Sequence, residues 1–137
     1  MRLSISEIME QANKIKDSEE RRKFILQNDS QALRTIIQYC YHPQVKWLLP
    51  KGEPPYKPSE HVESQGMLYG EARKLYLFVE GGNDALTKPK REQLYIQMLE
   101  SLDKNDAKIL ASIKDKKLPY KYLTKIFFER TFPGLLG

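Results

Sequence analysis

Residues 4–15 read Ser4-Ile5-Ser6-Glu7-Ile8-Met9-Glu10-Gln11-Ala12-Asn13-Lys14-Ile15. The opening Ser-x-x-Glu spacing is typical of a capping box, in which each side chain accepts a hydrogen bond from the other residue's backbone amide. The apolar side chains then recur every three or four residues, which places them on one face of a helix. This stretch therefore predicts a capped, amphipathic α-helix at the start of the chain.

The same helical spacing continues along the rest of the chain. Asp17 and Ser30 are residue types that begin helices, and the proline at position 43 ends the third helix. Later helices are predicted from Ser64 to Val79, from Thr87 to Leu102, from Asp106 to Ile113 and from Leu123 to Phe132. No segment alternates with a period of two, and we find no internal repeat. The sequence thus predicts an all-α protein, a compact bundle of six to seven short helices.

A proline-rich segment separates two groups of helices. The 137 residues suit a single domain, with N-terminal helices in 1–43, the proline-rich loop in 44–63 and C-terminal helices in 64–133. Four prolines within residues 50–58 exclude a regular helix there. We expect residues 47–49 to fill the gap between the two helical groups. The alternative is a contact surface for a protein partner, made by Trp47, Pro55 and Tyr56.

The composition favours a protein of a reducing, intracellular compartment. The chain has one cysteine, no run of about 18 apolar residues and no signal peptide at its start. Cys40 falls on the apolar face of the third predicted helix, where a buried structural thiol is expected rather than a nucleophile.

We find no motif for catalysis or for cofactor binding. His42 and His61 are far apart and belong to no zinc-binding pattern, and the glycine-rich loops of nucleotide-binding enzymes are missing from the sequence. We therefore expect no enzymatic activity, no metal and no cofactor.

Positive charge gathers in the second half of the chain. In total 23 Lys and Arg stand against 18 Asp and Glu, a net charge of +5. Residues 104–130 hold eight of these bases and only three acids. Such a stretch attracts phosphate groups or acidic proteins, although a solvated surface is the simpler interpretation. We expect the bases to form one continuous stripe on the exterior.

Two local patterns place bases where phosphate would bind. Residues 81–91 combine a glycine pair with a basic helix start, although the pair also suits a helix cap. Residues 106–130 suit a helix-turn-helix whose second helix presents Lys121, Lys125 and Arg130, with an ordinary helical hairpin as the alternative. The candidate nucleic-acid or phosphate contacts are Lys88, Lys90, Arg91, Lys116, Lys117, Lys121 and Lys125.

Four longer strings carry a resemblance to a known family. They are LLPKGEPPYKP (residues 48–58), EARKLYLFVEGGN (71–83), KREQLYIQMLE (90–100) and IKDKKL (113–118). Together they resemble small uncharacterised proteins of T-even-like tailed phages, notably those that infect marine cyanobacteria. The resemblance implies a viral protein made in the cytoplasm of an infected host cell, and it carries no known activity or site residues.

These observations favour a non-enzymatic accessory protein that binds nucleic acid or a nucleoprotein complex through its basic C-terminal half. The alternative is a protein-interaction module, either an inhibitor of a host protein or a minor virion component, acting through residues 47–58. Neither interpretation involves a membrane.

Overall fold

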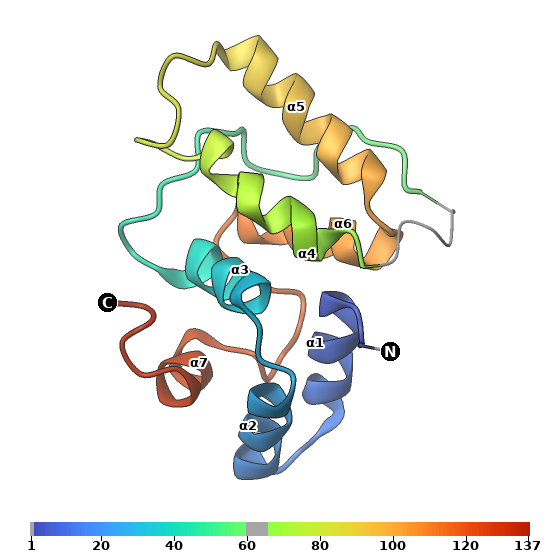
Figure 1. Ribbon diagram of the computed structural model, residues 1–137, viewed down its shortest axis with the longest axis vertical. Helices are drawn as coiled ribbons and strands as arrows, with labels where there is room; N and C mark the ends of the chain where they lie inside the picture. Colours follow the sequence, from blue (N-terminus) through green and yellow to red (C-terminus); the bar gives the residue numbers. More distant parts are fainter. Residues whose placement is uncertain (1, 60–65) are drawn as a thin grey trace.

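The computed structural model describes residues 2–59 and 66–137, which are built from helices packed on one another (Figure 1). The helices are α1 (Ile5–Lys14), α2 (Ser18–Gln27), α3 (Gln31–Tyr41), α4 (Leu68–Glu71), the 3₁₀ helix η2 (Ala72–Phe78), α5 (Lys88–Ser101), α6 (Lys104–Ile113) and α7 (Lys125–Thr131). Within these ranges the extended backbone forms only isolated bridges, between Trp47 and Val79 and between Ser59 and Asp103. The all-α prediction is confirmed. His61 and the predicted helix start at Ser64 lie outside the described residues.

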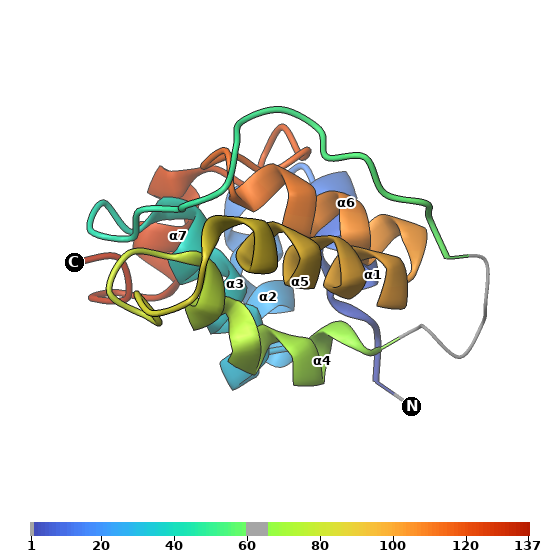
Figure 2. The ribbon, with the colours of Figure 1, turned by 90° about the horizontal axis from the view of Figure 1, so that it is seen from above.

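The helices of the two halves of the chain share one core. α3 lies in the middle of the molecule and packs against α4, η2 and α6, while α1 contacts both α2 and α6 (Figure 1). Every helix contributes buried apolar side chains to this core. Seen from above, the proline-rich segment runs along the outside of α6 and α5 (Figure 2).

Local side chains begin the helices as the sequence predicts. The Ser4 hydroxyl accepts a hydrogen bond from the Glu7 amide at 3.2 Å, and the Glu7 carboxylate accepts one from the Ser4 amide at 2.9 Å. This is the reciprocal capping box. Asp17, Ser30 and Thr87 cap α2, α3 and α5 in the same way, each with a side-chain oxygen that accepts a backbone amide.

The segment after residue 66 is the main departure from the predicted α-helix. Only α4 is α-helical, and the chain then tightens into η2, in which Ala72, Leu75 and Phe78 are buried. These side chains are three residues apart, so the three residues per turn of a 3₁₀ helix align them, whereas 3.6 residues per turn would rotate Phe78 away from Ala72. The alignment brings the Phe78 ring onto Tyr95, with 5.3 Å between ring centroids.

The glycine pair that follows η2 is required by the backbone. Gly81 has φ +85°, a left-handed conformation, and a Cβ atom at Gly82 would lie 1.8 Å from the Tyr76 carbonyl oxygen. The Gly81 amide already donates to the Asp84 carboxylate at 3.0 Å. These contacts favour the helix-cap interpretation over a phosphate-binding loop.

The last helix is placed differently from both sequence predictions for residues 106–130. Residues 114–124 separate α6 from α7, whereas a helix-turn-helix or a helical hairpin needs a turn of only a few residues. α7 packs against α2 instead. The helix-turn-helix and hairpin predictions are therefore both wrong.

Candidate nucleic-acid interface

The predicted phosphate contacts do not form one stripe. Lys88, Lys90 and Arg91 belong to the start of α5, at the upper end of the molecule in Figure 1. Lys125 is the first residue of α7, at the lower end, and Lys121 precedes it by four residues. The two groups must therefore be considered separately. Within residues 104–130, for which the sequence predicts one continuous stripe, Lys114 and Lys116 bind protein oxygens, so the stripe is interrupted.

At the start of α5 the structure leaves two of the three bases exposed. The Arg91 side chain is only 7% exposed, and its Nη2 atom donates to the Leu86 carbonyl at 2.8 Å. Its guanidinium therefore ties the preceding loop to α5 and is withdrawn from the surface. Lys88 and Lys90 are exposed. Their positive charges lie at the start of a helix, where they interact unfavourably with the helix dipole.

Lys116 holds the C-terminal end of α3. Its Nζ atom donates to the carbonyl oxygens of Tyr39, His42 and Val45 at 3.4, 2.8 and 3.1 Å. Carbonyls at a helix end lack partners within the helix, and a lysine ammonium satisfies several of them at once. Burial lowers the pKa of Lys116. We therefore leave Lys116 out of the candidate surface.

Lys114 and Asp115 form a clamp that sequence reasoning missed. The Lys114 side chain is 1% exposed, and its ammonium donates to the Gly52 carbonyl at 2.6 Å and to the Asp115 carboxylate at 3.0 Å. The same carboxylate accepts the Gly52 amide at 3.2 Å. Both backbone groups of Gly52 are thus held by two consecutive side chains. In the sequence these residues look like two more solvated charges.

The proline-rich segment is fastened to the body of the protein. The Trp47 indole N–H donates to the Tyr39 carbonyl at 2.9 Å, and the two rings meet edge to face. Farther along, the Lys57 amide donates to the Glu100 carboxylate at 2.8 Å. Trp47 and Tyr56 both pack against the core, which favours the gap-filling interpretation, whereas Pro55 is exposed.

A small cavity lies between this segment and α5. Its volume is about 220 Å³, and Tyr95, Ile96 and Lys114 line it from the helices. The proline-rich segment supplies the remaining walls, among them Leu49, Pro54 and Pro55. The cavity is small compared with ordinary ligand pockets, which occupy about 300–1,000 Å³.

Four further bases lie along one stretch of chain, and we call Lys117, Lys121, Lys125 and Arg130 the cationic surface. All four side chains are exposed. Residues 116–130 contain five bases and a single acid, so this stretch carries four of the chain's five net positive charges. None of the four forms an ion pair with any acid in residues 2–59 and 66–137. Their charge is available to an anionic partner.

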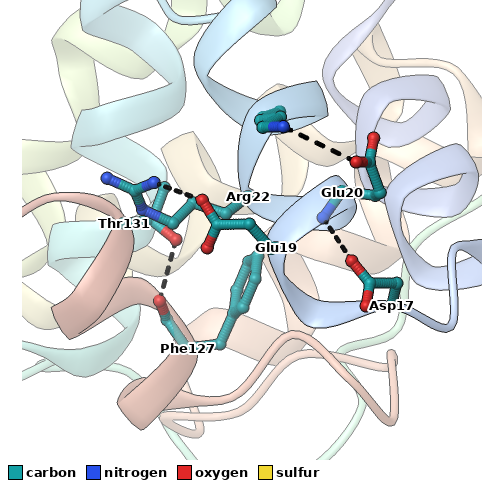
Figure 3. Close-up of polar contacts among 7 residues, drawn as sticks. Asp17, Glu19, Glu20, Arg22, Phe127 and Thr131 are labelled. Atoms are coloured by element: carbon teal, nitrogen blue, oxygen red, sulfur yellow. Dashed lines mark hydrogen bonds and ion pairs between the residues drawn. The ribbon is translucent and has the colours of Figure 1, made fainter.

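The acids of the neighbouring helix α2 do not neutralise this surface. Figure 3 shows the Glu19 carboxylate beside Arg22, at 2.9 Å. Glu20 pairs with Lys23 at 3.6 Å, and the Asp17 carboxylate caps α2 by accepting the Glu20 amide at 2.9 Å. All three acids have their partners within residues 17–23. Packing of α2 on α7 therefore brings no unpaired acid to the tail, in which Glu129 is the one acid among residues 116–130.

An exposed aromatic ring stands within the cationic surface, and sequence reasoning did not single it out. The Tyr122 side chain is 38% exposed, and Ile126, four residues farther along, is 63% exposed. The Tyr122 amide donates to the Asn13 side-chain oxygen at 2.9 Å, which fixes this stretch to α1. The one sequence signal was the position of the ring between Lys121 and Lys125.

The cysteine, the possible metal ligands and the lengths of the helices were also considered from the sequence. Cys40 is buried, as predicted, and burial raises the pKa of its thiol to about 12. The described residues contain no group of three or more His, Cys, Asp or Glu side chains suited to a metal ion. Among the helices that the structure describes, none is both long and apolar enough to cross a membrane.

A family model described as a family of unknown function, DUF6433, matches residues 8–120. No curated protein and no solved structure matches the chain.

Proposed function

We propose that this chain, which belongs to the DUF6433 family of unknown function, is a non-enzymatic protein that binds nucleic acid, free or in a nucleoprotein complex. The observation that carries the proposal is the cationic surface. Its four exposed bases have no acidic partner in the described part of the chain.

The spread of these charges favours a polymer over a small anion. Lys117, Lys121, Lys125 and Arg130 are distributed over fourteen residues instead of converging on one point. Nucleic acid presents a phosphate every few ångströms along each strand, so several cations engage at once, and each contact releases bound counterions. Affinity for such a polymer depends steeply on salt concentration.

The test is fluorescence anisotropy with labelled single- and double-stranded oligonucleotides at several salt concentrations. Neutralisation of four phosphates predicts a slope of about −3 to −4 for log affinity against log salt on a duplex. The double variant Lys121→Gln/Lys125→Gln removes two of the contacts, so we expect a slope shallower by about 2 and an affinity at least about tenfold lower at low salt.

The start of α5 supplies a matched control. Lys88→Gln/Lys90→Gln removes the same charge from two lysines that are also exposed. We expect this variant to bind within about twofold of wild type. Equal weakening by both double variants would show that only net charge matters, and would contradict the assignment to the tail. Stronger weakening at α5 would move the interface to Lys88 and Lys90.

The cavity beside the proline-rich segment supports a second candidate, contact with a protein partner. Pro55 is exposed at its edge, and apolar residues form most of its walls. A tagged wild-type chain would then retain a protein that Pro55→Ser loses, with equal thermal stability of the two chains. Loss of stability together with the partner would instead support a gap-filling role.

The sequence resemblance described above extends the proposal to origin and location. Strings such as residues 48–58 and 71–83 support a phage accessory protein that acts in the cytoplasm of the infected host cell. Affinity capture of the tagged chain from infected cells, with and without nuclease treatment, tests this extension. Loss of all captured partners after nuclease treatment would agree with binding through nucleic acid.

A further inference from the structure

We infer that the bound nucleic acid is single stranded, and that one of its bases stacks on the exposed ring of Tyr122. This inference rests on the proposed function, because it names the substrate class of the same surface. It starts from the position of an aromatic ring among cations, a combination typical of proteins that bind single strands.

The Tyr122 ring is held in place from the inside of the protein. The Arg21 guanidinium lies over it, 4.8 Å from the ring centroid. Arg21 is itself fixed, since its Nε and Nη2 atoms donate to the Ile15 carbonyl at 2.9 and 2.7 Å and Nη2 also donates to the Lys16 carbonyl at 3.0 Å. The ring therefore loses little conformational freedom when a ligand binds.

Tyr122 differs from the other rings that have a cation above them. In the described residues these rings belong to Tyr69, Phe127 and Phe132 as well. The two phenylalanines are buried, and Tyr69 is half-buried with its hydroxyl donating to the Leu3 carbonyl. Tyr122 alone among them is exposed. Part of its ring, in a residue that is 38% exposed, is accessible to a flat ligand.

The charges around the ring suit a strand whose base reaches it. The Lys121 ammonium lies over the Tyr122 ring, 5.4 Å from its centroid, on a flexible side chain that a stacking base can displace toward its own phosphate. Lys125 follows Tyr122 by three residues. A stacked base would therefore bring its own phosphates to nearby cations. In a duplex the bases are stacked on one another and cannot reach a surface ring, so stacking selects unpaired nucleotides.

The test compares three probes on the full-length chain: a single-stranded oligonucleotide, the duplex of the same length, and heparin, which has negative charge but no bases. Tyr122→Leu still covers the Arg21 guanidinium yet offers no aromatic face. We expect it to weaken single-strand binding about tenfold and to leave duplex and heparin binding within about twofold. Tyr122→Phe keeps the face and should bind like wild type.

Tyr76→Leu is the matched control, since Tyr76 is 48% exposed and lies on η2, outside the cationic surface. It should leave all three affinities unchanged, and circular dichroism melts should show every variant folded at the assay temperature. Unchanged single-strand binding in Tyr122→Leu, or equal weakening for all three probes, would overturn the inference while the proposed function stands. If wild type binds only an acidic polypeptide and none of the three probes, the proposed function itself fails.

Discussion

Lys114 and Lys116 are close neighbours of Lys117 in the sequence, but their side chains lie in different surroundings from that of Lys117. The first two ammonium groups are engaged with protein oxygens, at Gly52 and Asp115 and at the end of α3. Lys117 is exposed and forms no ion pair in the described residues. One short stretch thus combines internal fastening with external charge.

The backbone adopts an unusual conformation at Lys116, directly before the exposed Lys117. Lys116 has φ +63°, a left-handed conformation that a residue with a Cβ atom adopts at a cost of about 1–2 kcal/mol. The three hydrogen bonds of its ammonium help to offset this cost. The difference teaches that the number of bases in a stretch overstates the charge available to a partner, because some of these bases stabilise the fold.

The largest effect is expected where the buried clamp is broken. Lys114→Met removes the ammonium but keeps an unbranched side chain, so the Gly52 carbonyl and the Asp115 Oδ1 atom lose the cation that donates to them. Removing one partner of a buried ion pair is strongly destabilising, so we expect a loss of about 3 kcal/mol in the free energy of unfolding. Urea denaturation measures it directly.

Lys117→Met is the control for this substitution. It makes the same chemical change three residues away on an exposed side chain, where an effect within about 0.5 kcal/mol is expected. Similar losses of unfolding free energy in Lys114→Met and Lys117→Met would contradict the assignment of the two lysines to different environments.

A smaller loss is expected at Lys116, and two substitutions sharpen its cause. Lys116→Ala removes the hydrogen bonds to the end of α3 but keeps the strained backbone, for a loss of about 2 kcal/mol. Lys116→Gly removes the same bonds and relieves the strain, so it should be about 1 kcal/mol less destabilising. Thermal unfolding of both variants shows which is more stable. A lower stability of Lys116→Gly than of Lys116→Ala would contradict the role of the backbone.

Much of the fold could be predicted because its signals are local. The capping oxygens of Ser4, Asp17, Ser30 and Thr87 lie within three residues of the amides that they accept. The change from α4 to η2 could not be predicted in the same way, since it depends on the contact of Phe78 with Tyr95, a residue of another helix.

The candidate site could be predicted only in part, for the same reason. The sequence indicated the basic tail, and Lys117, Lys121 and Lys125 are indeed exposed. The internal position of Lys116 depends on carbonyls more than 70 residues earlier in the chain. The position of the Tyr122 ring likewise depends on Arg21 in α2. Spacing along the chain does not report such contacts.

Asp106 extends the comparison to a buried acid whose partners are incomplete. This residue of α6 is fully buried, and its Oδ1 atom accepts the Ser6 amide at 2.9 Å, which ties α6 to the start of α1. Its Oδ2 atom has no hydrogen-bond partner in the described residues. The pKa of Asp106 is raised to about 6, chiefly by burial and also by the charges of Asp103 and Glu7, while the hydrogen bonds from Ser6 oppose the shift.

The smallest expected effect is therefore a dependence on pH. Because the folded protein holds this proton more tightly than the unfolded chain, the stability contributed by protonated Asp106 is present below about pH 4 and is lost as pH rises through about 6. Asp106→Asn keeps an acceptor for the Ser6 amide but cannot ionise. We expect it to be more stable than wild type by about 1 kcal/mol at pH 8 and no more stable at pH 4. Urea denaturation at both pH values measures the difference in unfolding free energy between the two proteins. The carboxylates that both proteins share contribute equally to each and cancel in this difference. A constant difference between the two proteins would show that Asp106 does not titrate in this range.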